Sequence, residues 1–363
     1  MTAARAALDE PSTWPSIWTD AEPLECCAVV PEAPDVATVS FVAPDGGWFR
    51  YRPGQFVTLE LPVPGGPSWR TYTISSSPSR PLTLGLTVKA APNSIGTRWM
   101  LDHLRVSMKL RARGPAGIFT IPTRGDGKYL FISAGTGITP SLSMTNYLYD
   151  RGLGTDVVLV NCARRPAEII CRRRLELMAS RVPSIKLHFI AEQEDAYDVW
   201  TGYRGRLTQI MLGMIAGDYL ERQVYCCGPE PFMQAVRDML IALGFDMENY
   251  HQESFALAVE TAAEAPVLDD FVPDEGKAAE IVFADSGVTA ACNQSETVLV
   301  AAKAAGLNIP NGCGFGVCGT CKIRKVAGQV HMVHNGGISA DDIAAGYILA
   351  CCSTPVGRVE VAV

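Results

Sequence analysis

The chain has 363 residues, an apolar fraction of 48% and a formal net charge of -7 at pH 7. This length predicts two or three domains, and so mild an acidic charge argues against nucleic acid as a partner. No run of about eighteen apolar residues occurs, and the N-terminus lacks the apolar stretch of a signal peptide. We therefore expect a cytoplasmic protein with no membrane span.

The first part of the chain predicts an antiparallel β-barrel. After an N-terminal extension over residues 1–22, residues 23–124 alternate in short runs such as "ATVSFVAP" and "LTLGLTVKA", broken by glycine and proline. One of these runs, "RTYTISS", carries Arg70, Tyr72 and Thr73. A guanidinium fork suits a phosphate, although this short motif alone also fits a surface arginine beside a half-buried tyrosine.

The character of the chain changes after residue 124. Residues 125–258 contain the continuous apolar runs "KYLFISAG", "DVVLVNCA", "IKLHFIAE" and "QVYCCGPE", separated by helical stretches. Such runs are typical of a doubly wound α/β domain with a parallel sheet. The first run continues into Gly135, Thr136 and Gly137 before a helix. A helix start preceded by glycines can bind a pyrophosphate, but so short a motif also fits a tight turn.

Two further segments follow in this domain. The run "VYCCGPEPFM" ends at Cys227, Gly228 and Pro229, hence at the carboxyl edge where parallel sheets bind ligands. Cys226 faces the other way and is expected in the core. In "HQESF", residues 251–255, an extended chain places His251, Glu253 and Phe255 on one face.

The last part of the chain predicts a metal centre. A linker rich in alanine, proline and acidic residues covers residues 259–277, and residues 278–363 follow as a further domain. There "CGFGVCGTC" spaces three cysteines as C-x4-C-x2-C, and a further cysteine follows after 29 intervening residues. Zinc ribbons instead pair two C-x2-C knuckles, so the spacing favours a plant-type [2Fe–2S] cluster over zinc. Cys351 and Cys352 are adjacent, and only one of them can face the cluster.

Barrel, parallel sheet and cysteine-rich domain, in this order, resemble the ferredoxin–NADP reductase superfamily with a fused β-grasp ferredoxin. "RTYTISS" matches its R-x-Y-[ST] flavin motif. The resemblance implies a flavin site, a nicotinamide site beside the C-G-P cysteine, and Cys351 as the fourth cluster ligand. Hydride transfer would occur beside Cys227, Glu253 and Phe255.

The resemblance assigns three sets of binding residues. The flavin residues are Arg70, Tyr72, Thr73, Thr87, Gly96 and Thr97. The nicotinamide residues are Gly135, Thr136, Gly137, Thr139, Cys227, Gly228 and Pro229. The cluster residues are Cys313, Cys318, Cys321 and Cys351.

The choice between FAD and FMN and the choice between NADH and NADPH each depend on a few residues. Asn93 and Ser94 stand where relatives carry a glycine pair, with Thr97 expected as the helix N-cap. The resemblance implies FAD, and the replaced glycines, which change the path of the flavin loop, leave FMN as the alternative. Arg164 and its arginine neighbours favour a 2′-phosphate, whereas an acid such as Glu168 favours the free ribose hydroxyl. We expect NADH because similar family members use it.

Together these sites predict an enzyme that receives hydride from NADH at a flavin and releases single electrons through a [2Fe–2S] cluster. The segments "YRGRL", "CCGPEPFM" and "HQESF" resemble segments of the reductase components of certain Rieske-type oxygenases. Those oxygenases demethylate betaine-type quaternary amines such as glycine betaine and stachydrine. The alternatives are a reductase of a hybrid-cluster protein or of another electron acceptor, and a non-enzymatic redox sensor. A sensor would not need both the flavin motif and the C-G-P cysteine.

Overall fold

A computed structural model describes residues 16–64, 66–91, 94–122, 127–152, 156–195, 199–254 and 278–310, then 316, 319, 321–332, 334 and 337–363. The chain divides into two compact units, Met1–Phe255 and Ala256–Val363. Within the described residues, no helix is long and apolar enough to cross a membrane.

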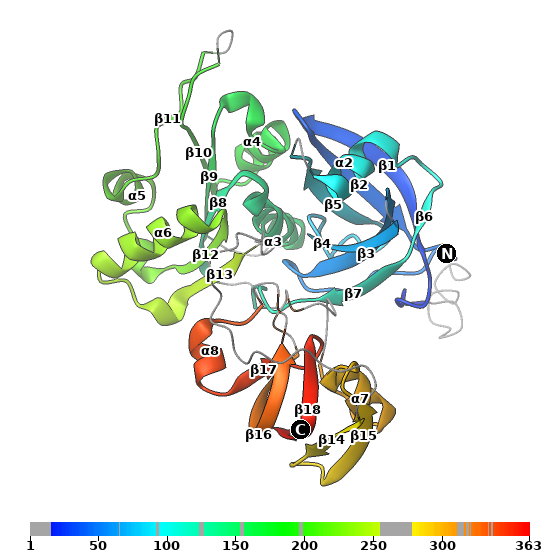
Figure 1. Cartoon of the computed structure of the whole chain (residues 1–363). Helices are drawn as coiled ribbons and strands as arrows, with labels where there is room; N and C mark the ends of the chain where they lie inside the picture. Colours follow the sequence, from blue (N-terminus) through cyan, green and yellow to red (C-terminus); the bar gives the residue numbers. More distant parts are fainter. Residues whose placement is uncertain are drawn as a thin grey trace, which may run out of the picture. The chain divides into compact units, whose positions relative to one another are not determined.

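The first part of the first unit is an antiparallel barrel made of two sheets (Figure 1). One sheet has the order β5-β2-β1-β6, from Leu84–Lys89, Val36–Val42, Leu24–Ala33 and Lys109–Leu110. The other has the order β4-β3-β7, from Gly66–Thr73, Phe56–Val63 and Ala112–Ala116. A bridge between Ile74 and Leu86 links the two sheets, and helix α2, Ile95–His103, packs against β3.

The second part of this unit is a parallel sheet with the strand order β11-β10-β9-β8-β12-β13. Its strands are β8 Lys128–Ala134, β9 Asp156–Ala163, β10 Ile185–Ala191, β11 Tyr203–Arg204, β12 Gln223–Gly228 and β13 Tyr250–Ser254. The helices are α3 Ile138–Arg151, α4 Arg172–Arg181, α5 Gln209–Ile215 and α6 Glu230–Ala242, with short 3-10 helices at Gly135–Gly137, Pro166–Glu168, Tyr219–Glu221 and Met247–Asn249. The chain reverses its direction of progress across the sheet between β8 and β12, which is the switch point where such sheets bind ligands.

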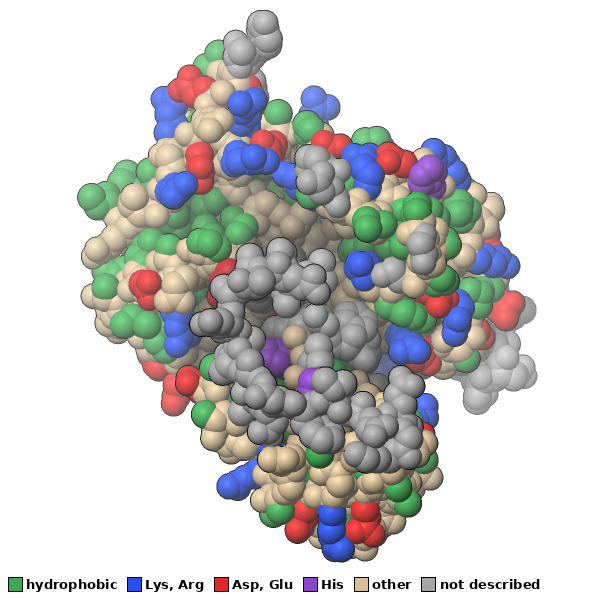
Figure 2. Space-filling view, in the orientation of Figure 1, with side chains coloured by type: hydrophobic (Ala, Val, Ile, Leu, Met, Phe, Trp, Pro, Cys, Tyr) green, Lys and Arg blue, Asp and Glu red, His purple; other side chains and the backbone are tan. Residues whose placement is uncertain are grey.

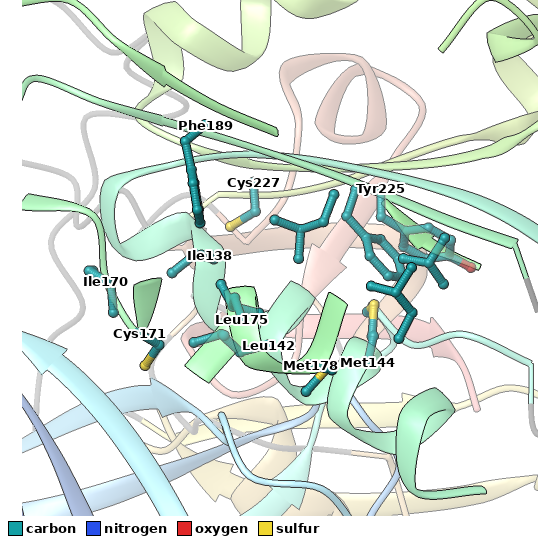
Figure 3. Close-up of a cluster of buried hydrophobic side chains, with 14 of the residues drawn as sticks. Ile138, Leu142, Met144, Ile170, Cys171, Leu175, Met178, Phe189, Tyr225 and Cys227 are labelled. Carbon is teal, nitrogen blue, oxygen red and sulfur yellow. The ribbon is translucent and has the colours of Figure 1, made fainter. Parts of the chain in front are cut away.

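Helices cover both faces of this sheet, which explains why its strands are apolar without alternation. Residues of α3 and α4 share one buried cluster with Tyr225 and Cys227 (Figure 3). Residues of α5 and α6 share another with Val224 and Cys226. The two adjacent cysteines therefore face opposite sides of the sheet, as predicted. Figure 2 shows apolar side chains on the outer surface of α5 and α6, where Ile210 and Met214 are exposed.

The second unit is a mixed five-stranded sheet with the order β15-β14-β18-β16-β17. The strands are β14 Ala278–Phe283, β15 Val288–Asn293, β16 Lys322–Met332, β17 Tyr347–Leu349 and β18 Ser353–Ala362. Helix α7, Val298–Ala304, packs on the sheet, and α8, Ala340–Ala344, precedes β17. The central pair β14 and β18 is parallel and the other pairs are antiparallel. The fold class predicted for each part of the chain is thus confirmed.

Candidate cofactor sites

The nicotinamide turn is built by the close approach of two strand ends. Gly137 ends the 3-10 turn after β8, and a Cβ there would lie 2.2 Å from the carbonyl oxygen of Cys227. Gly135 has a φ of +54°, which favours glycine. On the other strand, a Cβ on Gly228 would lie 3.2 Å from the Cβ of Ala134. Glycine therefore lets the carboxyl ends of β8 and β12 meet at the switch point.

The other predicted nicotinamide residues surround this turn. The Thr139 hydroxyl donates to the carbonyl oxygen of Thr136 at 3.0 Å, within the first turn of α3. Pro229 is the N-cap of α6. All seven predicted nicotinamide residues thus lie at the ends of β8 and β12 or in the first turns of the helices that follow. No side chain caps the start of α3, and an uncapped helix start preceded by glycines fits a pyrophosphate.

Cys227 lies deep in this region. It is 1% exposed and is paired in register with Glu253 on β13. Burial, together with the nearby Glu253 carboxylate, raises the pKa of the Cys227 thiol well above its ordinary value. The thiol is therefore neutral at physiological pH and suits packing against a ligand better than nucleophilic attack. Phe255, the third residue predicted here, lies outside the described residues.

His251 occupies the same face of β13, two residues before Glu253. Its ring stacks on Tyr225 with a centroid distance of 4.6 Å, and its Nε2 lies 3.0 Å from Oε1 of Gln223. Burial lowers the pKa of His251. The shared face expected for His251 and Glu253 is thus present.

The flavin motif lies on β4 beneath the first turn of α2. A Cβ on Gly96 would lie 3.2 Å from Cγ of Arg70 and 3.6 Å from the hydroxyl of Tyr72. The Tyr72 hydroxyl is buried and has no hydrogen-bond partner within the described part of the chain. Arg70 donates from Nη1 to the Trp69 carbonyl at 2.8 Å, and no carboxylate pairs with it among the described residues. An unpaired buried hydroxyl beside an uncompensated guanidinium fits an anionic flavin nucleotide.

The predicted threonines have different surroundings. Thr73 is buried at the end of β4. The Thr87 hydroxyl lies within hydrogen-bond distance of two protein hydroxyls, 2.9 Å from Thr38 and 2.8 Å from Ser75. Thr97 is not the helix N-cap that we expected. The chain already turns into the helix after Ser94, so helix α2 begins at Ile95 with Ser94 as its N-cap. Thr97 thus lies inside the first turn, and its hydroxyl donates back to the Ser94 hydroxyl at 2.6 Å.

In the second unit, the structure brings two of the four predicted cluster cysteines together. The amide of Gly316 donates to Sγ of Cys351 at 3.2 Å, and the amide of Cys351 donates to Sγ of Cys321 at 3.4 Å. Backbone amides directed at cysteine sulfurs are typical of iron–sulfur sites. Gly316 has a φ of +74°. Cys313 and Cys318 lie outside the described residues.

Comparison with known proteins identifies the same three parts. Residues 29–121 match the oxidoreductase FAD-binding domain family, residues 131–238 the oxidoreductase NAD-binding domain family, and residues 281–356 the 2Fe-2S iron-sulfur cluster binding domain family. The chain is 61% identical over 346 residues to the stachydrine N-demethylase reductase subunit Stc4 of Rhizobium meliloti, covering 95% of this chain and 98% of that protein. The chain therefore belongs to the family of oxygenase reductase subunits that includes Stc4.

Two further similarities agree with this membership. The glycine betaine monooxygenase reductase subunit of Pseudomonas aeruginosa is 44% identical over 350 residues, covering 93% of this chain and 94% of that protein. The crystal structure of phthalate dioxygenase reductase matches with a TM-score of 0.58 at 22% identity, covering 95% of this chain and all of that one. This structural match supports the fold.

Family membership confirms several expectations. The chain is an oxidoreductase of the flavin and iron–sulfur type, with domains for FAD, NAD and a [2Fe–2S] cluster. The two relatives named above are reductase subunits of an N-demethylase and of a monooxygenase. Sequence analysis did not single out the polar side chains of α3 that contact the barrel. Their signal is a set of polar residues with helical spacing, at positions 143, 146 and 150.

Proposed function

We propose that this protein is an NADH-dependent reductase that passes electrons through FAD and a [2Fe–2S] cluster to a Rieske non-haem iron monooxygenase, which demethylates a betaine-type quaternary amine. The observation that carries the proposal is the 61% identity to the stachydrine N-demethylase reductase subunit over nearly the full length of both chains. The glycine betaine reductase subunits, at 44% and 42% identity, support the same substrate class.

The residues present fit the expected groups. Arg70 would hold a flavin phosphate, Tyr72 would lie against the flavin ring, and the turn at Gly135–Gly137 would receive the dinucleotide pyrophosphate. When bound, FAD supplies the exchange between a two-electron hydride and single electrons. The protein orients the reactants and excludes water, and the neutral, buried Cys227 forms part of the wall beside the nicotinamide turn.

Contacts after β9 support NADH over NADPH. Arg164 pairs with Glu168 at 3.4 Å, and Glu168 also pairs with Lys89 at 3.0 Å. Nε of Arg165 donates to Gln193 at 3.2 Å. These two arginines are thus engaged by protein partners, whereas a 2′-phosphate would need them available.

We retain the expected division of the chain into residues 23–124, 125–258 and 278–363. The ranges matched by the three domain families each fall inside one of these parts. We also propose a cytoplasmic location, because NADH is the expected reductant and a reduced compartment keeps cysteines as thiols.

The experiment is reconstitution with purified stachydrine and glycine betaine Rieske oxygenases. NADH or NADPH is the reductant, and formaldehyde is measured. We expect formaldehyde from at least one betaine, with a larger kcat/KM for NADH than for NADPH. Reduction of a small dye by NADH without formaldehyde from either oxygenase would reject the proposed acceptor. A higher kcat/KM for NADPH would reject the dinucleotide assignment alone.

A further inference from the structure

Helix α3 is buried almost all round although it is rich in polar side chains. Its first eleven residues, Ile138 to Leu148, are all buried. Apolar members such as Ile138 and Leu142 point into the core beside the sheet (Figure 3). Ser143 is 0% exposed and Asn146 is 6% exposed. Buried polar groups are costly unless they are hydrogen-bonded, so the partners of these side chains indicate what the helix contacts.

Three polar side chains form one stripe along α3, and each of the three contacts the barrel segment over residues 75–80. The Ser143 hydroxyl donates to the Ser76 carbonyl at 2.7 Å. The Asn146 amide donates to the Ser75 carbonyl at 3.4 Å. One turn further on, Asp150 accepts from the Ser79 hydroxyl at 2.5 Å and pairs with Arg80. We call Ser143, Asn146 and Asp150 the α3 stripe.

The segment contacted by the stripe follows directly after the flavin motif. Ser75 stands two residues after Thr73, and its amide donates to the Gly85 carbonyl at 2.8 Å. The Ser76 hydroxyl accepts from the Gly85 amide at 2.9 Å and lies 2.7 Å from the Tyr51 hydroxyl. These bonds fix residues 75 and 76 to the barrel. Ser143 and Asn146 of the α3 stripe therefore contact a rigid continuation of the flavin strand.

Local helix physics does not account for the stripe. Asp150 is the penultimate residue of α3, where the helix dipole disfavours a carboxylate. Serine, asparagine and aspartate are all weak helix formers. Burial opposes ionisation of Asp150, but hydrogen bonds from Arg80 and Ser79 outweigh it and lower the pKa of the carboxyl. These side chains are explained by their contacts with the barrel.

The other end of the same helix is the nicotinamide turn, since α3 begins immediately after Gly137. We infer that the α3 stripe positions the nicotinamide turn relative to the flavin strand and thereby sets the geometry of hydride transfer. In this role Ser143, Asn146 and Asp150 are positioning residues, which act through the barrel segment that they contact. The inference rests on the proposed function only for FAD and NADH as the reactants in the first unit.

A positioning role has a particular kinetic consequence. Displacing reactants by about 1 Å can cost about a hundredfold in rate while binding is little affected. Loss of the stripe should therefore slow hydride transfer more than it weakens dinucleotide binding. A purely structural role would instead appear in thermal stability or in FAD content.

The test compares Asp150→Ala, Ser143→Ala and the double variant in the full-length holoprotein. Asp150→Ala should fold, because alanine is the best helix former and removes a carboxylate from the helix C-terminus. Glu60→Ala is the matched control, since Glu60 pairs with Arg111 at 3.1 Å within the barrel and makes no hydrogen bond or ion pair with α3 among the described residues. Flavin reduction is followed by rapid mixing with NADH and with 4-deuterated NADH. NAD+ titration, FAD content and amide hydrogen exchange are measured in parallel.

We expect the limiting rate of flavin reduction to fall about tenfold in the double variant, with a larger deuterium isotope effect. The Kd for NAD+ should change by less than about twofold, with FAD content unchanged and faster exchange in residues 75–80 and 143–151. An unchanged limiting rate, an equal loss in Glu60→Ala, or a loss explained by FAD content or NAD+ affinity would overturn the inference. If the double variant does not fold, the single variants decide by the same criteria. No oxygenase is added, so failure of the proposed acceptor would not affect the result.

Discussion

Cys351 and Cys352 are neighbours with different environments. Sγ of Cys351 accepts the Gly316 amide at 3.2 Å, whereas Sγ of Cys352 donates to the Leu349 carbonyl at 3.7 Å. A Cβ on Gly316 would lie 2.8 Å from Sγ of Cys352, so both sulfurs approach the same glycine. An amide that donates to sulfur stabilises a thiolate, which is the form that a cluster ligand takes. These contacts favour Cys351 as the cluster ligand.

We predict that Cys351→Ser removes the [2Fe–2S] cluster and that Cys352→Ser retains it. A ligand must be a thiolate, and serine at a true ligand position cannot replace it at neutral pH. The measurement is iron content together with the visible absorbance and the electron paramagnetic resonance of the dithionite-reduced protein. Retention of the cluster in Cys351→Ser with its loss in Cys352→Ser would reverse the assignment.

At the same residue scale, Thr97 shows where sequence reasoning reached its limit. The expected helix is present as α2 and its first turn lies beside Arg70, but its N-cap is Ser94 and not Thr97. Both serine and threonine are good N-caps, and boundaries depend on how the chain enters the helix. A local pattern cannot specify that entry. Residue chemistry was predictable here, whereas the exact helix start was not.

The turn between β8 and α3 depends on one glycine more than on the others. A Cβ on Gly137 would lie 2.2 Å from the oxygen and 2.4 Å from the carbon of the Cys227 carbonyl, both of which are backbone atoms. By contrast, a Cβ on Gly213 in helix α5 would meet no heavy atom within 4 Å apart from its chain neighbours and the backbone of its own helix. The first contact can be relieved only by separating the ends of β8 and β12.

We predict that Gly137→Ala destabilises the protein by about 1–3 kcal/mol, as overpacking does, and weakens NADH binding at least about tenfold by separating the two halves of the nicotinamide turn. FAD content should be unchanged. Thermal unfolding and NADH titration provide the two measurements. Gly213→Ala is the matched control and should stabilise its helix by about 0.5–1 kcal/mol. Normal NADH affinity in Gly137→Ala would show that the close approach does not shape the site.

At the scale of elements, the predicted strands were largely recovered. "KYLFISAG" contains β8 and "LTLGLTVKA" contains β5. Both were predictable because a continuous or alternating run of apolar residues indicates a strand with one or both faces buried. The α3 stripe was not predicted. Its partners lie about 70 residues earlier in the chain, and no local periodicity encodes which distant carbonyl a serine will meet. Sequence therefore predicted the sites as local motifs but not the contacts that fix their relative positions.

For the whole molecule, the two compact units separate the candidate site of hydride entry from the candidate site of electron exit. The first unit, Met1–Phe255, contains the candidate flavin and nicotinamide sites, and the second, Ala256–Val363, contains the candidate cluster site. Each unit has its own buried core. A unit with its own core can fold alone, so hydride entry and electron exit should be separable by truncation in the linker predicted over residues 259–277.

We predict that a protein truncated after Val267 folds, retains FAD and reduces a small dye with NADH at a rate close to that of the full-length protein. It should not support formaldehyde production by the partner oxygenase, because single electrons would have no cluster through which to leave.

The measurement adds equal amounts of truncated and full-length protein to the same oxygenase and betaine. A full-length Cys351→Ser variant is the control, since it removes the predicted cluster without removing the domain. Loss of formaldehyde in both proteins, with dye reduction retained, places the exit at the cluster. Formaldehyde from the truncated protein at the full-length rate would show that electrons leave directly from the flavin unit.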